Sequence, residues 1–591
     1  LEKRVSSLQD VFDFTPGVFA TSRDQGTGGI VSIRGSDIAT EGPRNGRGVR
    51  GYIDGVPLGR TEAGLTPALI DLLAAAYVEV YRGGASLRYG SLSSGGTINF
   101  VSKTGANNPG TAVRLTGGSF GYAQAQVETG GQDGDLDYYM SVSAQRYDGY
   151  RDQSEGKSLR LTSNMGWRIN EDVRTRFYLT VGTQHQELPS TVPLNQIDAM
   201  RRTSDSLSVR FDTDANFDLY VRAANKTQID MAGNGLLELS GFALYTHFDH
   251  LPTPFSGIVD NTWREGGLSV RWENSLRAFD RPLEVVTGAR YTYTDGQFKR
   301  WSHKNGGHER DQLVANDDFT AEILEAYGEG ALALTPSLKG FLGFQAVKTT
   351  RDIKDRYTGT VIAVPITAPN GPQPGSLAGD QSYGVSFDSL VPKIGLNWEW
   401  SPGNAVFANV TRAFEAPTGS DVSNIITANA RAGAGAGRLP DIEAQTATTF
   451  EAGARGRLDR LRYDLTVYRS AIDDEILTRC ATEISADCTE TVAFNADSTL
   501  HQGVEIGGEL RIMDDVGLPG ASLVLDLTGA FQDFRFDGDS RFGDERLPNV
   551  PRVFAIAALR WGGETGPYAR GTVRYTGDRT TTYDGSGGAA F

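Results

Sequence analysis

From about residue 110 onward, apolar and polar side chains alternate along the chain in segments of roughly ten residues. In residues 136–146, for example, Leu136, Tyr138 and Met140 would share one face, and the residues between them the other. Similar alternation returns in residues 122–128, 177–181, 268–273, 461–467 and 523–528. Because successive side chains of a strand point to opposite faces, this pattern predicts many β-strands, each with an apolar and a polar face.

The connections between these segments alternate between short and long. Turn-forming residues make up the short ones, at residues 170–172, 401–404 and 456–460. The long ones cover residues 188–205, 357–381 and 421–440. A soluble sandwich shows the same strand pattern, but the sustained repeat with a charged second face favours a transmembrane β-barrel. We therefore expect short periplasmic turns and long external loops.

The first hundred residues have a different character. Val78 and Val80 alternate with Glu79 and Tyr81, a glycine pair follows, and residues 97–102 form a second candidate strand. Residues 66–75 predict a helix with Thr66 at the N-cap and Pro67 at the first helical position. We expect two domains, covering residues 1–107 and 108–591.

Charge and hydropathy limit the classes of protein that fit. The formal net charge is -16, which argues against a nucleic-acid partner because phosphate binding requires clustered lysine and arginine. No apolar run reaches the roughly 18–20 residues of a membrane helix. The chain is therefore either soluble or a barrel, because only helices and closed barrels satisfy the backbone in lipid.

A series of motifs in the first hundred residues carries a family resemblance. In order, they are Ile33-Arg34-Gly35, Tyr52-Ile-Asp-Gly-Val-Pro57, Val78-Glu-Val-Tyr-Arg-Gly83, Tyr89-Gly90 and Gly95-Gly-Thr-Ile-Asn99. Together they resemble the plug domain of TonB-dependent outer-membrane receptors. The later segments 413–418 (AFEAPT) and 442–453 (IEAQTATTFEAG) are also similar to this family, although Glu415 stands where arginine is usual and Gln445 where glutamate is usual.

This resemblance implies an all-β transmembrane barrel of the 22-strand antiparallel type, with an N-terminal α/β plug domain in its lumen. The last clear strand of the sequence is near residues 568–575. We therefore expect an incomplete barrel with an open edge, which would leave backbone groups unpaired in lipid and prevent assembly in a membrane.

The resemblance also implies an electrostatic latch between plug and barrel. Arg34 and Arg82 match the plug arginines of the family, Glu451 matches one barrel glutamate, and Gln445 takes the place of the other. A buried pair is costly to break from one side, so these residues form a candidate switch. The alternative is that both arginines only cap the plug sheet.

Other candidate sites are weaker. In the family the plug loops contact ligand, which makes Arg23, Gln25, Arg60 and Glu62 candidate ligand-binding residues or, alternatively, solvated loop charges. We expect a disulfide between Cys480 and Cys488, with two free thiols as the alternative. We expect no metal site, because the paired histidines near residues 247–250 and 303–308 lack a third ligand in the nearby sequence. The G-x-S-x-G match at residues 117–121 precedes a strand rather than a helix, so we expect no catalysis.

The function implied by the resemblance is TonB-dependent uptake of an iron(III)–siderophore chelate across the bacterial outer membrane, in a branch similar to ferric citrate receptors. The implied partners are TonB with its inner-membrane energising complex, the ferric siderophore and the lipid bilayer. We expect a monomer with no cofactor of its own, because iron enters only as part of the transported chelate. A receptor for cobalamin or an oligosaccharide is the main alternative, and a passive porin is a further one.

Overall fold

The computed structural model describes most of the chain and leaves its longest connections out. The described residues are 7–22, 29–36, 47–59, 64–83, 89, 94–189, 192, 196–204, 209, 212–251, 257–303, 309–357, 382–422, 442–480, 491–563, 566–585 and 588–589.

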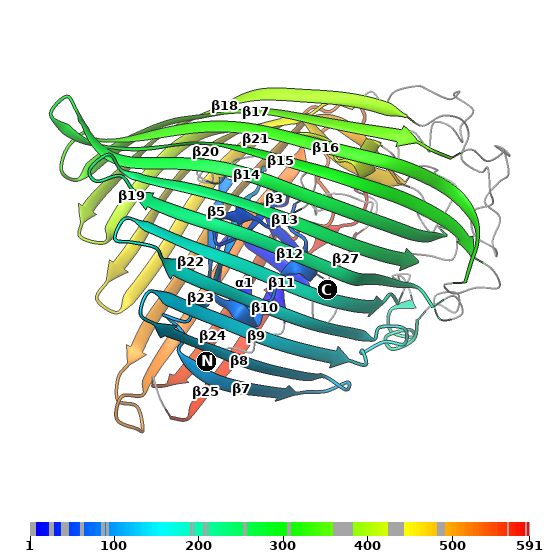
Figure 1. Cartoon of the computed structure of the whole chain (residues 1–591), viewed down its shortest axis with the longest axis horizontal. Helices are drawn as coiled ribbons and strands as arrows, with labels where there is room; N and C mark the ends of the chain where they lie inside the picture. The colour runs from blue at the N-terminus through cyan, green and yellow to red at the C-terminus, as the bar shows by residue number, and fades with distance from the viewer. Residues whose placement is uncertain are drawn as a thin grey trace.

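Nineteen of the described strands form one large barrel (Figure 1). Its first half comprises β7 (Gly110–Gly117), β8 (Ala123–Asp133), β9 (Leu136–Tyr147), β10 (Gly156–Arg168), β11 (Val173–Glu187), β12 (Asp214–Asp230), β13 (Leu236–Leu251), β14 (Ile258–Ala278), β15 (Arg281–His303) and β16 (Arg310–Ala333). Its second half comprises β17 (Leu338–Asp355), β18 (Tyr383–Ser401), β19 (Asn404–Glu415), β20 (Gln445–Leu458), β21 (Leu461–Cys480), β22 (Thr491–Met513), β23 (Ser522–Phe536), β24 (Val553–Gly562) and β25 (Tyr568–Thr576). Strands that follow one another in sequence pair antiparallel, as the alternating pattern and short turns predict.

The barrel wall is inverted relative to a soluble protein. On β9, Tyr139 and Ser141 are buried on the inner face, whereas Tyr138, Met140 and Val142 are each more than 40% exposed on the outer face. An apolar outer face with a polar inner face is typical of strands that contact lipid. None of the helices in the described residues is long and apolar enough to cross a membrane.

The closure of the barrel differs from the prediction. We expected an open edge, but the strand order returns from β25 to β7, with nineteen strands in the described chain rather than twenty-two. Because nineteen is odd, β25 and β7 run in the same direction, whereas sequential neighbours are antiparallel. This closure is thin: every sequential pair shares a long antiparallel register, whereas β25 and β7, two of the shortest barrel strands, share no such register in the described chain.

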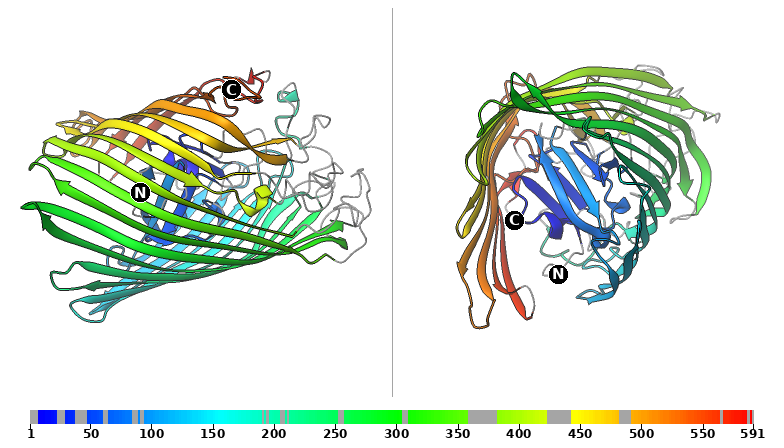
Figure 2. Two further views of the ribbon diagram at one scale, coloured as in Figure 1. Left: turned by 90° about the horizontal axis from the view of Figure 1, so that it is seen from above. Right: turned by 60° about the vertical axis from the view of Figure 1, so that its left-hand side comes forward.

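The plug lies inside the barrel (Figure 2). Helix α1 (Leu8–Phe12) begins with a capping box, in which Ser7 and Asp10 each accept a hydrogen bond from the other's backbone N–H. Strands β1 (Val18–Ser22) and β2 (Gly29–Ile33) form a hairpin. A four-stranded sheet follows in the order β4 (Val56–Pro57), β3 (Val49–Ile53), β6 (Gly96–Ser102) and β5 (Ala75–Arg82). Two short strands, β26 (Arg579–Thr580) and β27 (Gly588–Ala589), come after the barrel.

The predicted helix over residues 66–75 was wrong. The structure instead has two short 3₁₀ turns, η1 (Pro67–Leu69) and η2 (Leu72–Ala74), separated by an extended Ile70. The Asp71 side chain accepts a hydrogen bond from the Leu73 N–H and starts the second turn. Competition from such a short polar side chain interrupts a helix, and the break lets both Leu69 and Leu73 be buried.

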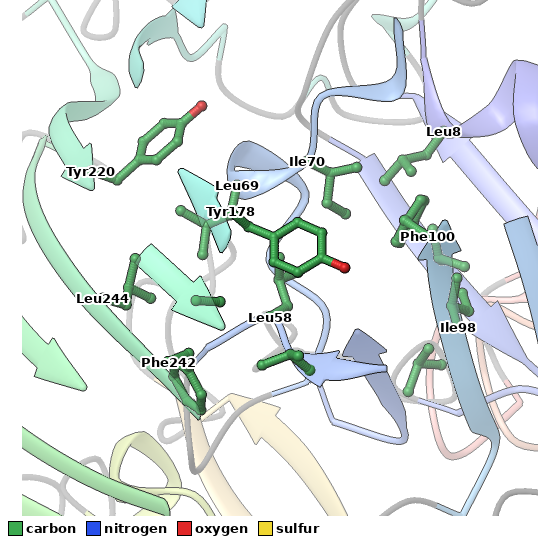
Figure 3. Close-up of a cluster of buried hydrophobic side chains, with 14 of the residues drawn as sticks. Leu8, Leu58, Leu69, Ile70, Ile98, Phe100, Tyr178, Tyr220, Phe242 and Leu244 are labelled. Carbon is green, nitrogen blue, oxygen red and sulfur yellow. The ribbon is translucent and has the colours of Figure 1, made fainter. Parts of the chain in front are cut away.

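Apolar residues of the plug pack directly against one side of the barrel wall (Figure 3). We call this region the apolar seam; its plug residues Leu58, Leu69 and Ile70 belong to the same buried cluster as Tyr178, Tyr220, Phe242 and Leu244 of β11, β12 and β13. A Cβ atom at Gly59 would lie 2.4 Å from the Leu244 side chain. Glycine at this position therefore allows the plug backbone to approach the wall.

Candidate functional site: the plug–barrel junctions

Arg34 lies in a strained turn that directs it toward the wall opposite the apolar seam. Its backbone is left-handed, with φ of 54°, and its N–H donates to the Gly17 carbonyl at 3.2 Å. A left-handed conformation at a residue other than glycine costs on the order of 1 kcal/mol. The contacts of the Arg34 side chain must therefore offset this cost.

The guanidinium of Arg34 binds carboxylates on two barrel strands. Its Nε and Nη2 atoms donate to the two oxygens of Glu505 on β22, at 2.9 and 3.2 Å. Its Nη1 donates to Glu451 on β20 at 2.6 Å. The guanidinium also lies 4.3 Å from the ring centroid of Tyr468 on β21, within the range of a cation–π interaction.

Arg82, the last residue of β5, shares Glu505 with Arg34. Its Nη1 donates to Glu505 at 2.6 Å and to the Pro16 carbonyl at 3.2 Å. Its Nη2 forms an ion pair with Asp464 on β21 at 3.0 Å. We call these five residues, Arg34, Arg82, Glu451, Asp464 and Glu505, the lower junction.

The lower junction combines two arginines with three carboxylates, and most of it is buried. The side chains of Glu505 and Arg34 are only 1% and 6% exposed, whereas that of Asp464 is 32% exposed. Burial alone would lower the pKa of Arg34, but the carboxylates of Glu505 and Glu451 raise it well above its ordinary value. Arg34 therefore stays charged, and the buried charges compensate one another.

The structure brings together three of the residues predicted for the latch: Arg34, Arg82 and Glu451. Sequence reasoning missed Glu505 and Asp464, although Glu505 provides the central carboxylate. Two sequence features could have identified these carboxylates. Gly503-Val504-Glu505 resembles a segment of the TonB-dependent receptor family, and Asp464 lies on the polar face of its strand. The alternation of apolar and polar residues predicts which face of a strand a side chain lies on, but it does not predict which plug residue that side chain contacts.

Gln445 does not lie at the lower junction. It lies beside Glu415 at a second contact between the barrel and the plug, which we call the upper junction. The Gln445 side chain donates to Glu415 at 3.1 Å and accepts from the Ile476 N–H at 2.8 Å. Its strand register explains this position, because Gln445 pairs directly with Glu415 across β19 and β20. Glutamine therefore supports Glu415 here and does not replace a carboxylate of the lower junction.

Glu415 binds the plug through a backbone N–H and a hydroxyl group. Its two oxygens accept hydrogen bonds from the Gly48 N–H at 2.7 Å and from the Ser94 hydroxyl at 3.0 Å. An arginine at this position has no acceptor and would be unable to satisfy the Gly48 N–H. The plug contacts thus account for glutamate at a position where the resemblance led us to expect arginine.

A buried ion pair completes the upper junction. Arg47 of the plug donates to Asp421 at 2.6 Å and to the Ile476 carbonyl at 3.0 Å. The side chain of Asp421 is fully buried and is held by the backbone N–H and the hydroxyl of Thr418, both at 2.8 Å.

The two junctions lie at different heights of the barrel. Glu415 ends β19 and Gln445 begins β20, so the upper junction lies where a long connection leaves the wall. Asp464 lies close to the short turn at residues 459–460. Since long loops of such barrels face outward and short turns face the periplasm, the upper junction is nearer the outside.

Several predicted site residues lie outside the described part of the chain. These are the candidate ligand-binding residues Arg23, Gln25, Arg60 and Glu62, together with Cys488 and the side chain of Cys480. The G-x-S-x-G segment joins β7 to β8 and thus does not stand between a strand and a helix. His247 contacts Asp218 and Asp260, each at 3.1 Å.

Family models match almost the entire chain. The model described as "TonB-dependent Receptor Plug Domain" matches residues 1–97, and the model "TonB dependent receptor-like, beta-barrel" matches residues 80–590. The chain therefore belongs to the TonB-dependent receptor family, a family of outer-membrane transport receptors rather than enzymes. A plug held inside a large barrel agrees with this assignment.

Individual relatives are distant in sequence but similar in fold. A metal-pseudopaline receptor of Pseudomonas aeruginosa strain UCBPP-PA14 is 21% identical over 559 residues, covering 86% of this chain and 71% of that protein. The ferric yersiniabactin uptake receptor of Yersinia pestis has a TM-score of 0.73 at 16% identity, covering 100% of this chain and 88% of that one. The unliganded ferric citrate transporter has a TM-score of 0.77 at 15% identity, covering 99% and 83%.

Proposed function

We propose that this TonB-dependent receptor takes up an iron(III)–siderophore chelate across the outer membrane. The observation that carries the proposal is a plug joined to the barrel wall by the lower junction, in a chain of a family whose transport depends on TonB. The similar folds of receptors for ferric yersiniabactin and ferric citrate support an iron chelate as the cargo.

The two junctions fit a ligand-controlled release of the plug. The upper junction joins an outer connection of the barrel to the plug through Arg47 and Asp421. A chelate that binds at the outer end would bias this contact, since a ligand shifts an equilibrium only through different contacts in the two states. The lower junction is the latch that a pull by TonB has to open, because its charges lie nearer the periplasm.

The chemistry of the outer end is compatible with an anionic chelate that has aromatic groups. Phe494 and Phe542 are partly buried and pack against Tyr583, which belongs to an apolar cluster that also contacts the plug. The guanidinium of Arg479 lies 5.6 Å from the Phe494 ring centroid, and that of Arg541 lies 5.1 Å from the Phe542 ring. Arginine beside aromatic rings supplies both charge and stacking surface.

A chelate of a different metal is the second candidate. The observation that favours it is the similarity over most of the chain to a receptor for metal-pseudopaline. The two candidates differ in the metal and chelator that saturate the receptor and share the same transport cycle.

Tryptophan fluorescence of the purified receptor in detergent tests the cargo. The titration panel comprises ferric citrate, ferric hydroxamates, ferric catecholates, nickel and zinc chelates of a carboxylate-rich chelator, cobalamin and an oligosaccharide. We expect saturable quenching by one ferric chelate at submicromolar concentration. Quenching by nickel or zinc chelates alone would favour the second candidate, and a response only to cobalamin or the oligosaccharide would overturn both.

Single-channel conductance in a planar bilayer distinguishes the receptor from a porin. A plugged receptor stays nearly closed until urea releases the plug, whereas an open barrel conducts at once. Immediate conductance of the folded protein would contradict the proposal.

A further inference from the structure

His501 is a histidine of β22 that is buried on the inner face of the barrel wall, where the plug meets it. Its side chain is only 5% exposed. The imidazole ring stacks on Phe534 of β23, with 4.3 Å between the ring centroids and 11° between the planes. A Cβ atom at Gly35 of the plug would lie 2.2 Å from that Phe534 ring. The plug turn that carries Arg34 therefore packs closely against this pair of rings.

Both ring nitrogens of His501 face hydrogen-bond acceptors. Nε2 lies 3.2 Å from Oε2 of Glu475 on β21, and Nδ1 lies 3.4 Å from the backbone carbonyl oxygen of Arg34. A neutral imidazole has one N–H and one acceptor nitrogen, so it donates to only one of these two groups. The doubly protonated imidazolium donates to both. The geometry therefore matches a cation held between a barrel carboxylate and the plug backbone.

The backbone of β21 departs from regular strand geometry where it brings Glu475 to His501. Ala471 and Asp473 are exposed, and uninterrupted alternation would expose Glu475 as well. The residue between them, Asp474, instead has a left-handed backbone with φ of 56°, and Glu475 is only 7% exposed. A strained residue of this kind persists only where the surrounding contacts determine its conformation.

The same stretch of β21 belongs to the upper junction. The Ile476 carbonyl accepts a hydrogen bond from Arg47, and the Ile476 N–H donates to Gln445. Arg47 also attracts the Glu475 carboxylate, which accepts a further hydrogen bond from the Thr499 hydroxyl. Through Glu475, His501 thus connects the backbone of the lower junction to the strand segment that holds the upper junction.

The charged groups around His501 fall into separate pairs. Arg34 of the plug binds Glu505 and Glu451, and Arg47 binds Asp421. The residue packed against His501 from β23, Phe534, carries no charge. The carboxylate that faces His501 is that of Glu475. A buried imidazolium here has its own counter-charge, as a buried cation requires.

We propose that His501 is an imidazolium while the plug is in place, so that seating of the plug takes up one proton. On release, the Arg34 carbonyl leaves His501. The imidazolium then gives one proton to water and becomes a neutral imidazole with a single N–H. Because the seated state holds the additional proton, plug release becomes easier as the pH rises. This step belongs to the movement of the plug and does not depend on the cargo.

The urea dependence of conductance in planar bilayers, measured at about pH 5.5 and about pH 8.5, tests the proposal. These values lie on either side of the ordinary histidine pKa of about 6.5. In the unchanged receptor, the equilibrium constant for plug release should rise at least about tenfold between them, because one additional proton corresponds to at most about tenfold per pH unit.

Two matched variants assign this rise to one histidine. His501→Phe keeps a ring that stacks on Phe534 but has no ring nitrogen, and it should lose most of the rise. His247→Phe removes a histidine of β13 whose partners are Asp218 and Asp260, away from the plug, and it should retain the rise. A rise of the same size in His501→Phe, or none in the unchanged receptor, would overturn the proposal.

A second measurement uses the unchanged receptor and so does not depend on folding of a variant. The chain has six histidines, and ¹⁵N NMR of histidine-labelled receptor distinguishes imidazolium from neutral imidazole. At the higher pH, we expect an imidazolium signal in the folded receptor that disappears when urea releases the plug. Absence of any imidazolium signal before release, or persistence of every such signal after it, would contradict the uptake of a proton by the seated plug.

Discussion

The plug meets opposite sides of the barrel through different chemistry. At the apolar seam, Leu58 and Leu69 pack against apolar side chains of β11 to β13. The hydrogen bonds beside this contact run from Arg222 of β12 to the backbone carbonyls of Val56 and Pro57, at 3.3 and 2.8 Å, and involve no plug side chain. At the lower junction, Arg34 and Arg82 make six hydrogen bonds to the carboxylates of Glu451, Asp464 and Glu505, at distances of 2.6 to 3.2 Å. The strength of the apolar seam depends mainly on buried apolar area and on shape. The strength of the lower junction depends on the positions of a few charged atoms.

This difference in chemistry suits the two contacts to different roles, one in the stability of the plug and the other in the control of its release. Apolar contact is non-directional and is lost gradually as surfaces separate. A buried ion pair contributes little net stability when intact, but removing one partner leaves an uncompensated charge that costs about 3–5 kcal/mol. We therefore propose that the apolar seam supplies much of the adhesion of the plug, whereas the lower junction fixes its position and acts as the latch that controls its release.

The largest effect is expected from Glu505→Gln, which removes the carboxylate that both arginines share. Plug release should become easier by about 3–5 kcal/mol because two buried guanidinium groups lose their main partner. The measurement is the urea concentration at which receptors in planar bilayers begin to conduct. As a control, Glu284→Gln removes an exposed partner of Lys339 and should change release by less than about 1 kcal/mol. Equal midpoints for the two variants would contradict a central role of Glu505.

Leu69→Ala should weaken the apolar seam by about 2–4 kcal/mol, the range for truncation of a buried leucine. Leu69 is 2% exposed, whereas the control Leu115→Ala alters a lipid-facing residue that is 78% exposed. The same conductance assay should show earlier release only for Leu69→Ala. In contrast to Glu505→Gln, this variant should retain TonB-dependent uptake of the cargo. If Leu69→Ala abolished uptake without making plug release easier, the different roles assigned to the apolar seam and the lower junction would be contradicted.

Gln445→Glu should destabilise the upper junction by about 1–3 kcal/mol, because it places a second carboxylate beside buried Glu415. The side chains of these two residues are now 3.1 Å apart. The swap Glu415→Gln/Gln445→Glu restores a single carboxylate and should recover most of the loss in plug release. Failure of the swap to recover any stability would show that repulsion between carboxylates is not the cause.

Asp464→Asn should have the smallest effect, less than about 1 kcal/mol in plug release. Asp464 is partly exposed, and Arg82 keeps its 2.6 Å contact with Glu505. An effect as large as that of Glu505→Gln would show that Asp464, and not Glu505, is the main partner of Arg82.

The sequence predicted the wall of the barrel better than its junctions. Alternation over one strand is a local property, so Tyr138 and Met140 were assigned to one face correctly. The partner of Glu505 depends on the pairing of β21 with β22 and on the position of the plug, and neither is encoded locally. Arg34 and Arg82 were found because they lie in motifs that the family shares.

Two further errors have the same physical origin. The apolar spacing of Leu69, Ile70, Leu72 and Leu73 suggested a helix, but tertiary packing and the Asp71 side chain favour two separate turns. Gln445 was assigned to the latch by analogy, whereas its register places it beside Glu415. In both cases a long-range contact decided between local alternatives.

A double-mutant cycle on Arg82 and Glu505 tests the lower junction most directly. The free energy of plug release would be measured for the unchanged receptor, Arg82→Gln, Glu505→Gln and the double variant, from the urea dependence of conductance. We predict that the double variant is more stable than the sum of the single changes implies, with a coupling energy of about 1–3 kcal/mol. Additive effects, within about 0.5 kcal/mol, would contradict the claim that this pair holds the plug in place.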